Sequence, residues 1–90
     1  MKVENMKSLK SYREIANQFK IYNNGIKYFQ SYDTVIVKIN RKGEIFLDHA
    51  WDCSNTTSRY RAIYLGETTA ETRKKIEKGN YKVTDLNKEK

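Results

Sequence analysis

The strongest constraint on the fold is the run Asn23-Asn24-Gly25, because segments of alternating apolar and polar residues lie on both sides of it. Asparagine and glycine tolerate the positive φ that a tight hairpin turn requires. The flanking residues 19–22 and 26–29 have the period of two that is typical of strands. The sequence therefore predicts an antiparallel hairpin at this turn.

The hairpin is predicted to continue into further strands. Residues 31–33 form a polar break, residues 34–39 are almost all β-branched, and residues 41–43 supply another turn before residues 44–48. β-Branched residues fit the pleated surface of a sheet. The expected product is an antiparallel meander of about four strands.

Side chains along a strand alternate between the two faces of a sheet. The face expected to form the core carries most of the aliphatic side chains and one tyrosine: Tyr28, Val35, Val37, Ile39, Ile45 and Leu47. The opposite face is expected to carry a smaller apolar group: Phe29, Ile36 and Phe46. A helix, another chain or a ligand must cover that group, and we favour a helix.

A short amphipathic helix is predicted before the sheet, from residue 6 to about residue 17. Its apolar residues recur at helical spacing: Leu9, Tyr12, Ala16 and Phe19. Polar and charged residues occupy the other faces. This segment is expected to form a helical addition at the N-terminus.

Two further helices are predicted after the sheet. Ser54 is a good N-cap for the first helix, and Gly66 is a good end for it. Thr68 and Glu71 form a capping box for the second helix, which is expected to stop at Gly79.

The predicted fold class is α+β, in a single small domain with the order α-β-β-β-β-α-α-β. Its last strand is expected within residues 81–86, pairing at a sheet edge. The chain divides into an N-terminal helical segment (1–18), an α+β domain (19–86) and a polar tail (87–90). Ninety residues can bury only one core.

The chain is strongly basic, with 18 Lys and Arg against 11 Asp and Glu and a formal net charge of +7. The excess lies in residues 1–24 and 59–90, whereas residues 25–58 are balanced. Such charge favours polyanionic partners, although many domains are basic without binding one. One cysteine, short apolar runs and the lack of a secretory pattern predict a cytoplasmic protein without a membrane span.

The expected partner-binding surface consists of cations on the two later helices. Helical spacing places Lys74 and Lys78, and Lys75 and Lys78, on one face. The alternative interpretation of such a run is a solvated helix face. The predicted contact residues are Arg59, Arg61, Arg73, Lys74, Lys75 and Lys78.

No catalytic residue, metal or cofactor is predicted. His49 and Cys53, with Asp48 and Asp52, are all zinc-binding types, but they lack the repeated pairs of specific zinc spacing. We interpret them as polar residues that close a strand. A small ribonuclease using His49 and Arg59, with Tyr60 and Arg61, remains an alternative.

The aromatic residues divide between core and surface. Trp51 is expected to lie in the core; the alternative is an exposed ring on which a ligand stacks. Tyr12, Tyr22 and Tyr32 are weaker candidates for the core. Exposed tyrosines among cations either stack on bases or anchor a protein interface. The sequence leaves these two uses open.

Two motifs resemble a family of small uncharacterised proteins from phages and plasmids. They are Ser31-Tyr32-Asp33-Thr34 and the run Trp51-Asp52-Cys53-Ser54-Asn55-Thr56-Thr57, followed by Tyr60. The resemblance covers roughly residues 19–86, and Cys53 stands where the family is expected to have an aromatic residue. The resemblance implies no catalytic residue in this chain.

The resemblance implies a phage or mobile-element protein that binds host machinery. We therefore predict a non-enzymatic inhibitor of a host defence nucleoprotein complex, similar to anti-CRISPR proteins, acting in the host cytoplasm. A direct DNA- or RNA-binding accessory protein is the alternative. A free sheet edge, or the group Phe29, Ile36 and Phe46, would support a homodimer.

Overall fold

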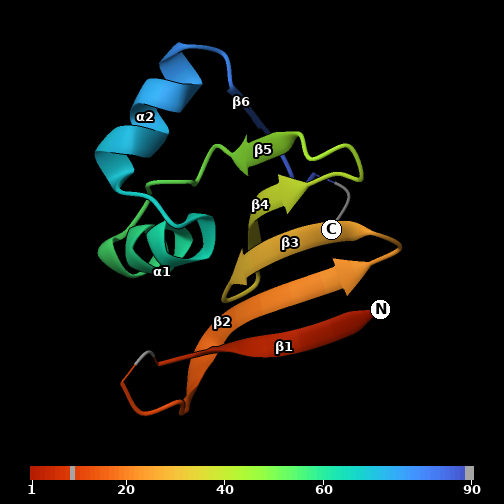
Figure 1. Ribbon diagram of the computed structural model, residues 1–90, viewed down its shortest axis with the longest axis vertical. Helices are drawn as coiled ribbons and strands as arrows, with labels where there is room; N and C mark the ends of the chain where they lie inside the picture. The colour runs from red at the N-terminus through yellow and green to blue at the C-terminus, as the bar shows by residue number, and fades with distance from the viewer. Residues whose placement is uncertain (9, 89–90) are drawn as a thin grey trace.

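The computed structural model describes residues 1–8 and 10–88, and these form a six-stranded sheet with two helices on one face (Figure 1). Five strands come first, followed by both helices and the last strand. The elements are β1 (Lys2–Lys7), β2 (Glu14–Asn23), β3 (Ile26–Ser31), β4 (Thr34–Ile39), β5 (Ile45–Asp48), α1 (Asn55–Leu65), α2 (Thr69–Glu77) and β6 (Tyr81–Thr84).

The strands lie in the order of the sequence, β1-β2-β3-β4-β5-β6. Neighbours are antiparallel from β1 to β5, whereas β6 runs parallel to β5. A parallel pair needs a crossover, and α1 and α2 provide it. The crossover explains why both helices cover the same face of a mixed sheet.

The predicted meander of about four strands with an N-terminal helix is wrong. The observed order is β-β-β-β-β-α-α-β, and residues 2–7 pair with β2 as a strand. Tyr12 and Ala16, whose spacing suggested a helix, are both exposed, and Leu9 lies outside the described residues. Met6 is the residue of this segment that joins the core. Pairing with β2 therefore overrides a weak helical period.

The predicted faces of the sheet are also partly wrong, because β4 contains an irregularity at Ile36. Phe29 is paired with Val37 and Gln30 with Val35, so Ile36 is an extra residue in β4. Such a bulge reverses the side-chain alternation relative to the neighbouring strand. Ile36 and Val37 consequently both face the helices.

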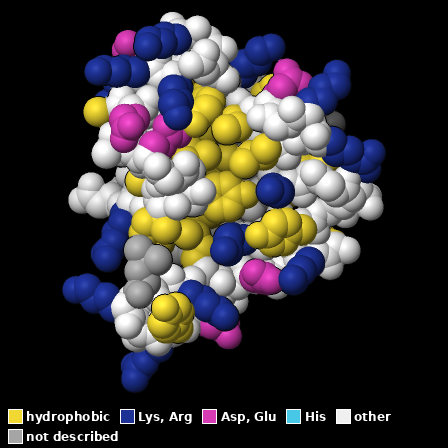
Figure 2. Space-filling model, in the orientation of Figure 1, with side chains coloured by type: hydrophobic (Ala, Val, Ile, Leu, Met, Phe, Trp, Pro, Cys, Tyr) yellow, Lys and Arg dark blue, Asp and Glu magenta, His cyan; other side chains and the backbone are white. Residues whose placement is uncertain are grey.

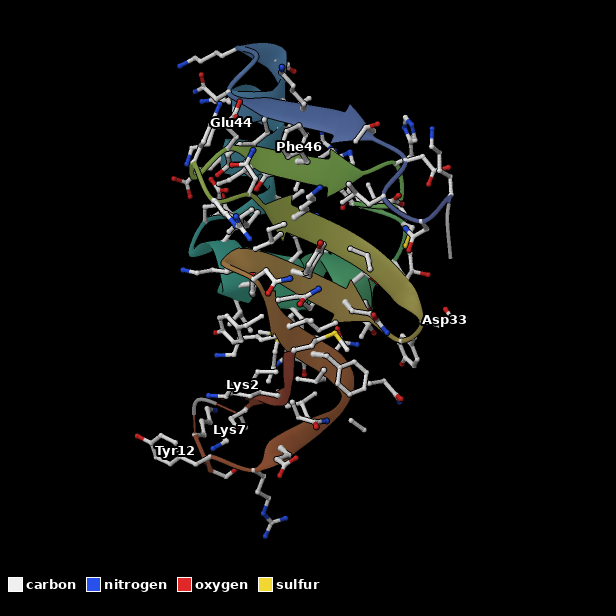
Figure 3. All side chains as sticks on the ribbon, turned by 90° about the vertical axis from the view of Figure 1, so that its right-hand side faces the viewer. Lys2, Lys7, Tyr12, Asp33, Glu44 and Phe46 are labelled. Atoms are coloured by element: carbon white, nitrogen blue, oxygen red, sulfur yellow. The ribbon has the colours of Figure 1, made fainter. Side chains whose placement is uncertain are left out.

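Three aligned residues form the centre of the core: Phe29, Val37 and Leu47, each 0% exposed. The registers place Tyr28, Lys38 and Phe46 together on the opposite face. Figure 3 shows this second face, with Phe46 labelled and no helix in front of it. Phe29 and Phe46, expected on one face, thus lie on different faces.

Several local predictions are confirmed. Asn24 and Gly25 have φ of 52° and 80° in the turn between β2 and β3. The Ser54 side chain accepts a hydrogen bond from the Thr57 amide, and Gly66 ends α1 in the left-handed conformation. The capping box of Thr68 and Glu71 begins α2.

Truncating the two phenylalanines should distinguish the two faces. We expect Phe29→Ala to lower the free energy of unfolding by about 3–5 kcal/mol, because it opens a cavity in the core. Phe46→Ala should lower it by less than half as much, since its ring lies on the open face. Urea denaturation of both variants checks this, and equal losses would contradict the assignment of faces.

Candidate functional site

The six helix cations predicted as a contact surface differ in their exposure and in their partners within the fold. Arg61 is 0% exposed, so it cannot contact a partner in this conformation. Its guanidinium donates hydrogen bonds to the Trp51 carbonyl and to Thr69 Oγ1, and lies 4.9 Å from the centre of the Trp51 ring. Arg61 is therefore a structural residue that connects the end of β5 with both helices.

Arg73 completes this arrangement from α2. Its guanidinium lies 5.3 Å from the centre of the Trp51 ring and 3.0 Å from an Asp52 oxygen. Asp52 also lies 3.7 Å from Arg61. We call these four residues, Trp51, Asp52, Arg61 and Arg73, the tryptophan corner. Burial lowers the pKa of Arg61, and the carboxylates of Asp52 and Glu67 oppose that shift.

The remaining cations divide into one paired and three exposed residues. Lys75 lies 2.7 Å from a Glu67 oxygen and also bonds the Tyr81 hydroxyl. Arg59, Lys74 and Lys78 are exposed, and within residues 1–8 and 10–88 none of them forms an ion pair. These three are the part of the predicted surface that is accessible without breaking an ion pair, although the Arg59 guanidinium lies 5.6 Å from the centre of the Tyr60 ring.

The motif that followed Trp51 forms the junction between sheet and helix. Ser54 caps α1, and Thr57 shares a buried hydrogen bond of 3.2 Å with Ser31 of β3. The Ser58 hydroxyl donates to Asp52. The side chains of Asp52, Ser54 and Thr57 thus bond within the fold, which accounts for these three motif residues without a ligand.

The polar residues around His49 do not gather as metal ligands. Asp48 is engaged by the Ala50 and Leu86 amides and by the Asn87 side chain, while His49 and Cys53 are exposed. The described residues contain no group of three or more His, Cys, Asp or Glu that could hold a metal. Burial would raise the pKa of Asp48, but these hydrogen bonds outweigh it and lower the pKa.

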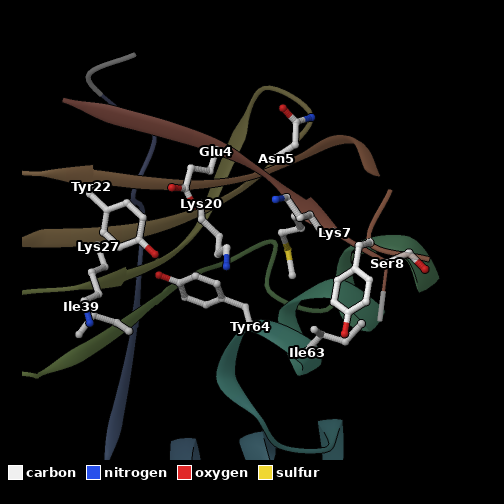
Figure 4. Close-up of a pocket in the computed structure, with 12 residues that line it drawn as sticks. Glu4, Asn5, Lys7, Ser8, Lys20, Tyr22, Lys27, Ile39, Ile63 and Tyr64 are labelled. Carbon is white, nitrogen blue, oxygen red and sulfur yellow. The ribbon is translucent and has the colours of Figure 1, made fainter. Parts of the chain in front are cut away.

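A second candidate site is a hollow between the β1–β2 hairpin and α1, which we call the hairpin hollow. It has a volume of about 550 Å³. The sheet contributes Glu4, Lys7, Lys20, Tyr22 and Lys27, and α1 contributes Tyr64. Figure 4 shows Lys20 and Lys27 pointing from the sheet into the space that Tyr64 borders. In Figure 2, this face combines apolar side chains with cations among them.

The hairpin hollow is electropositive. Lys7, Lys20 and Lys27 line it, and Glu4 is its one acidic lining residue among those described. Glu4 already forms an ion pair of 2.8 Å with Lys2. The hydrogen bond and charge of Lys2 lower the pKa of Glu4. Across the β1–β2 pair Glu4 lies opposite Lys20 and Glu14 opposite Lys7, so the three lysines of the hollow outnumber its acidic lining residue but do not lack acidic neighbours.

Tyr64 forms a rigid wall of the hollow. Its ring stacks on Phe29 of the core, with 5.5 Å between the ring centres. Burial raises the pKa of Tyr64 to about 12, so its phenol stays neutral at physiological pH. Tyr64 can thus present a fixed aromatic surface and an uncharged hydroxyl group.

The sequence analysis did not predict this site, although the predicted turn at Gly25 indicates which side chains of the two flanking strands lie together. The turn aligns Tyr22 with Lys27 and Lys20 with Phe29, so these side chains share a face. That register brings two lysines and a tyrosine together from adjacent strands. The contribution of Glu4 and Lys7 depends on β1, which the sequence pattern did not predict.

Residues 1–80 match the model of a family described as a family of unknown function (DUF8033). The chain belongs to this family. The matched region of DUF8033 includes β1 and β2, and therefore the sheet wall of the hairpin hollow. No curated protein and no solved structure matches the chain. Neither helix of the part that the structure describes is long and apolar enough to cross a membrane.

Replacement of Arg61 tests the structural role of the tryptophan corner. We expect Arg61→Ala to lower the free energy of unfolding by about 2–4 kcal/mol, because it leaves a cavity and an unbonded Trp51 carbonyl. Arg59→Ala on the exposed side of α1 is the control and should change it by less than about 0.5 kcal/mol. Chemical denaturation measures both, and an Arg61 variant as stable as the control would contradict the assignment.

Asp48 should make the stability of the fold depend on acid pH. The pKa of Asp48 is lower in the folded than in the unfolded chain, where it is about 3.9. Its carboxylate therefore stabilises the fold fully above the unfolded pKa, and this stabilisation is lost as the pH falls through the folded pKa. We expect Asp48→Asn to reduce stability by about 1–2 kcal/mol at pH 7 and to weaken the pH dependence below about pH 5. Asp33→Asn, in an exposed turn, is the control. A parallel pH profile for Asp48→Asn and the unmodified chain, from urea midpoints, would disprove this role.

Proposed function

We propose that the chain is a non-enzymatic binding protein whose partner is the nucleic acid of a host nucleoprotein complex. The main support for this proposal is the hairpin hollow. Among the described residues, its lining includes three lysines, Lys7, Lys20 and Lys27, and one acidic residue, Glu4. Because three lysines line the hollow and Glu4 is paired with Lys2, an anionic partner meets net attraction there. The net charge of +7 adds a long-range attraction for phosphates.

The exposed helix cations support the same partner chemistry. Arg59, Lys74 and Lys78 extend from α1 and α2 into solvent. Phosphate contacts by such side chains attract nucleic acid without reading its sequence. They serve as auxiliary contacts, because their charges are not gathered into a hollow.

The resemblance to phage and plasmid proteins supports a role in mobile elements. A cytoplasmic protein of this kind would inhibit a host defence complex by occupying its guide or target strand. A positively charged chain cannot imitate nucleic acid, so it would act by binding it. Direct binding of cellular nucleic acid without a host complex is the simpler form of the same activity.

A small ribonuclease is less well supported. Cleavage would require a general acid or base next to a phosphate-binding cation. His49 lies in the loop after β5 and Arg59 on α1, while Arg61 of the same proposed set is 0% exposed and bonded within the fold. We therefore place the function in binding.

A tagged pull-down from host lysate, divided into nuclease-treated and untreated halves, tests this function. We expect nucleic acid in the untreated half, alone or within a ribonucleoprotein, and loss of that nucleic acid on treatment. Binding of purified nucleic acid should weaken steeply with salt, because each phosphate contact on a single strand contributes about −0.7 to the logarithmic slope. Retention of one host protein without nucleic acid, insensitive to salt, would reject the proposal.

A further inference from the structure

We propose that the hairpin hollow is a binding site for a single-stranded segment of nucleic acid, with bases on its tyrosines and phosphates on Lys7, Lys20 and Lys27. This inference rests on the proposed function and names both its site and its ligand class. Proteins that bind single strands combine a cationic groove with aromatic side chains on which bases stack. The hollow has both components.

The hollow is large enough for an unpaired nucleotide. Its volume of about 550 Å³ lies within the range of about 300–1,000 Å³ that is usual for small-molecule pockets. Such a space holds a base with its sugar and phosphate. A base within a duplex is stacked and paired, and must leave the helix before it can enter a pocket.

The lysines form a path for a backbone across three strands. Lys7 belongs to β1, Lys20 to β2 and Lys27 to β3. A chain of phosphates that crosses these strands meets one cation from each of them. Lys7 and Lys27 are exposed, so they can reach phosphates without losing a partner in the fold.

The tyrosines supply surfaces for bases. Tyr12 lies in the loop between β1 and β2, lines the hollow and is 79% exposed. Tyr22 and Tyr64 line the hollow from β2 and α1, and Tyr64 is held in place by Phe29. Figure 3 shows Tyr12 extending from the hairpin loop with its ring unpacked.

This combination favours nucleic acid over an acidic peptide. Carboxylates of a peptide would pair with the lysines but would leave the tyrosine rings without a stacking partner. Every base has an aromatic face, so a single strand uses both kinds of side chain. An exposed aromatic ring directly beside cations is therefore better matched to a strand of nucleotides.

Fluorescence anisotropy with a labelled single-stranded oligothymidylate tests the site in the full chain. We expect Lys7→Glu with Lys27→Glu to weaken binding at least about tenfold and to reduce the salt slope by about 1.4, the share of two phosphates. The matched control, Lys42→Glu with Lys82→Glu, makes the same charge change at exposed positions in the β4–β5 turn and on β6, away from the hollow and from the helix cations. It should weaken binding less than about threefold.

A second pair of variants tests stacking without changing charge. Tyr12→Ala should weaken binding about fivefold or more, the lower limit of what one stacked base contributes. Tyr32→Ala is the control, because Tyr32 is also an exposed turn tyrosine, 56% exposed, but does not line the hollow. All of these residues are on the surface, so urea midpoints should stay unchanged.

Competition experiments distinguish binding of single-stranded nucleic acid from binding of duplex, free nucleotide or acidic peptide. We expect the oligomer to be displaced by unlabelled single strand, and poorly by duplex, by thymidine monophosphate or by poly-glutamate. Equal weakening by the two charge reversals, or equal competition by duplex or poly-glutamate, would overturn the inference and leave general polyanion binding. Displacement by the mononucleotide at the same nucleotide concentration would also overturn it. Absence of any polyanion binding would instead reject the proposed function.

Discussion

The buried guanidinium of Arg61 is the interaction on which the arrangement of sheet and helices depends. It bonds the Trp51 carbonyl at the end of the β5 loop and Thr69 at the start of α2, while its own backbone belongs to α1. A buried charge is tolerated only when hydrogen bonds and an opposite charge compensate it, and Asp52 supplies the latter. Three segments are therefore held at one point, which sets the crossover that makes β6 parallel to β5.

The same crossover leaves part of the sheet uncovered. α2 packs near β6 and α1 near β3, whereas β1 and β2 extend beyond the helices (Figure 1). The helices do not cover the inward side chains at this end of the sheet, so Lys20 of β2 and Lys27 of the adjacent β3 keep contact with solvent. The hairpin hollow is thus a consequence of a six-stranded sheet that is wider than its two-helix layer. Its lysines and Tyr12 lie where burial was not required, whereas Tyr64 packs against the core.

Local features of the fold were predictable, but the candidate site was not. The turn at Gly25, the Ser54 cap and the Thr68–Glu71 capping box each depend on residues within a few positions of one another. Helical spacing does not reveal burial, so it could not show that Arg61, one of the six predicted contact residues, is internal. Arg61 points inward only because Trp51 and Thr69 arrive there from other segments. The hairpin hollow escaped prediction because residues 1–18 were interpreted as a helical segment and not as strands.

The sequence by itself determined the turns, the helix ends, the positive charge and the existence of a sheet, since these follow from φ preferences, capping side chains, composition and alternation. Tertiary structure alone decided that residues 2–7 form a strand, that Ile36 is an extra residue in β4, and that Arg61 is internal. Each of these depends on backbone pairing or burial between residues distant in sequence. Such pairings can outweigh local preferences of a fraction of a kcal/mol per residue, which is why the N-terminal helical period did not prevail.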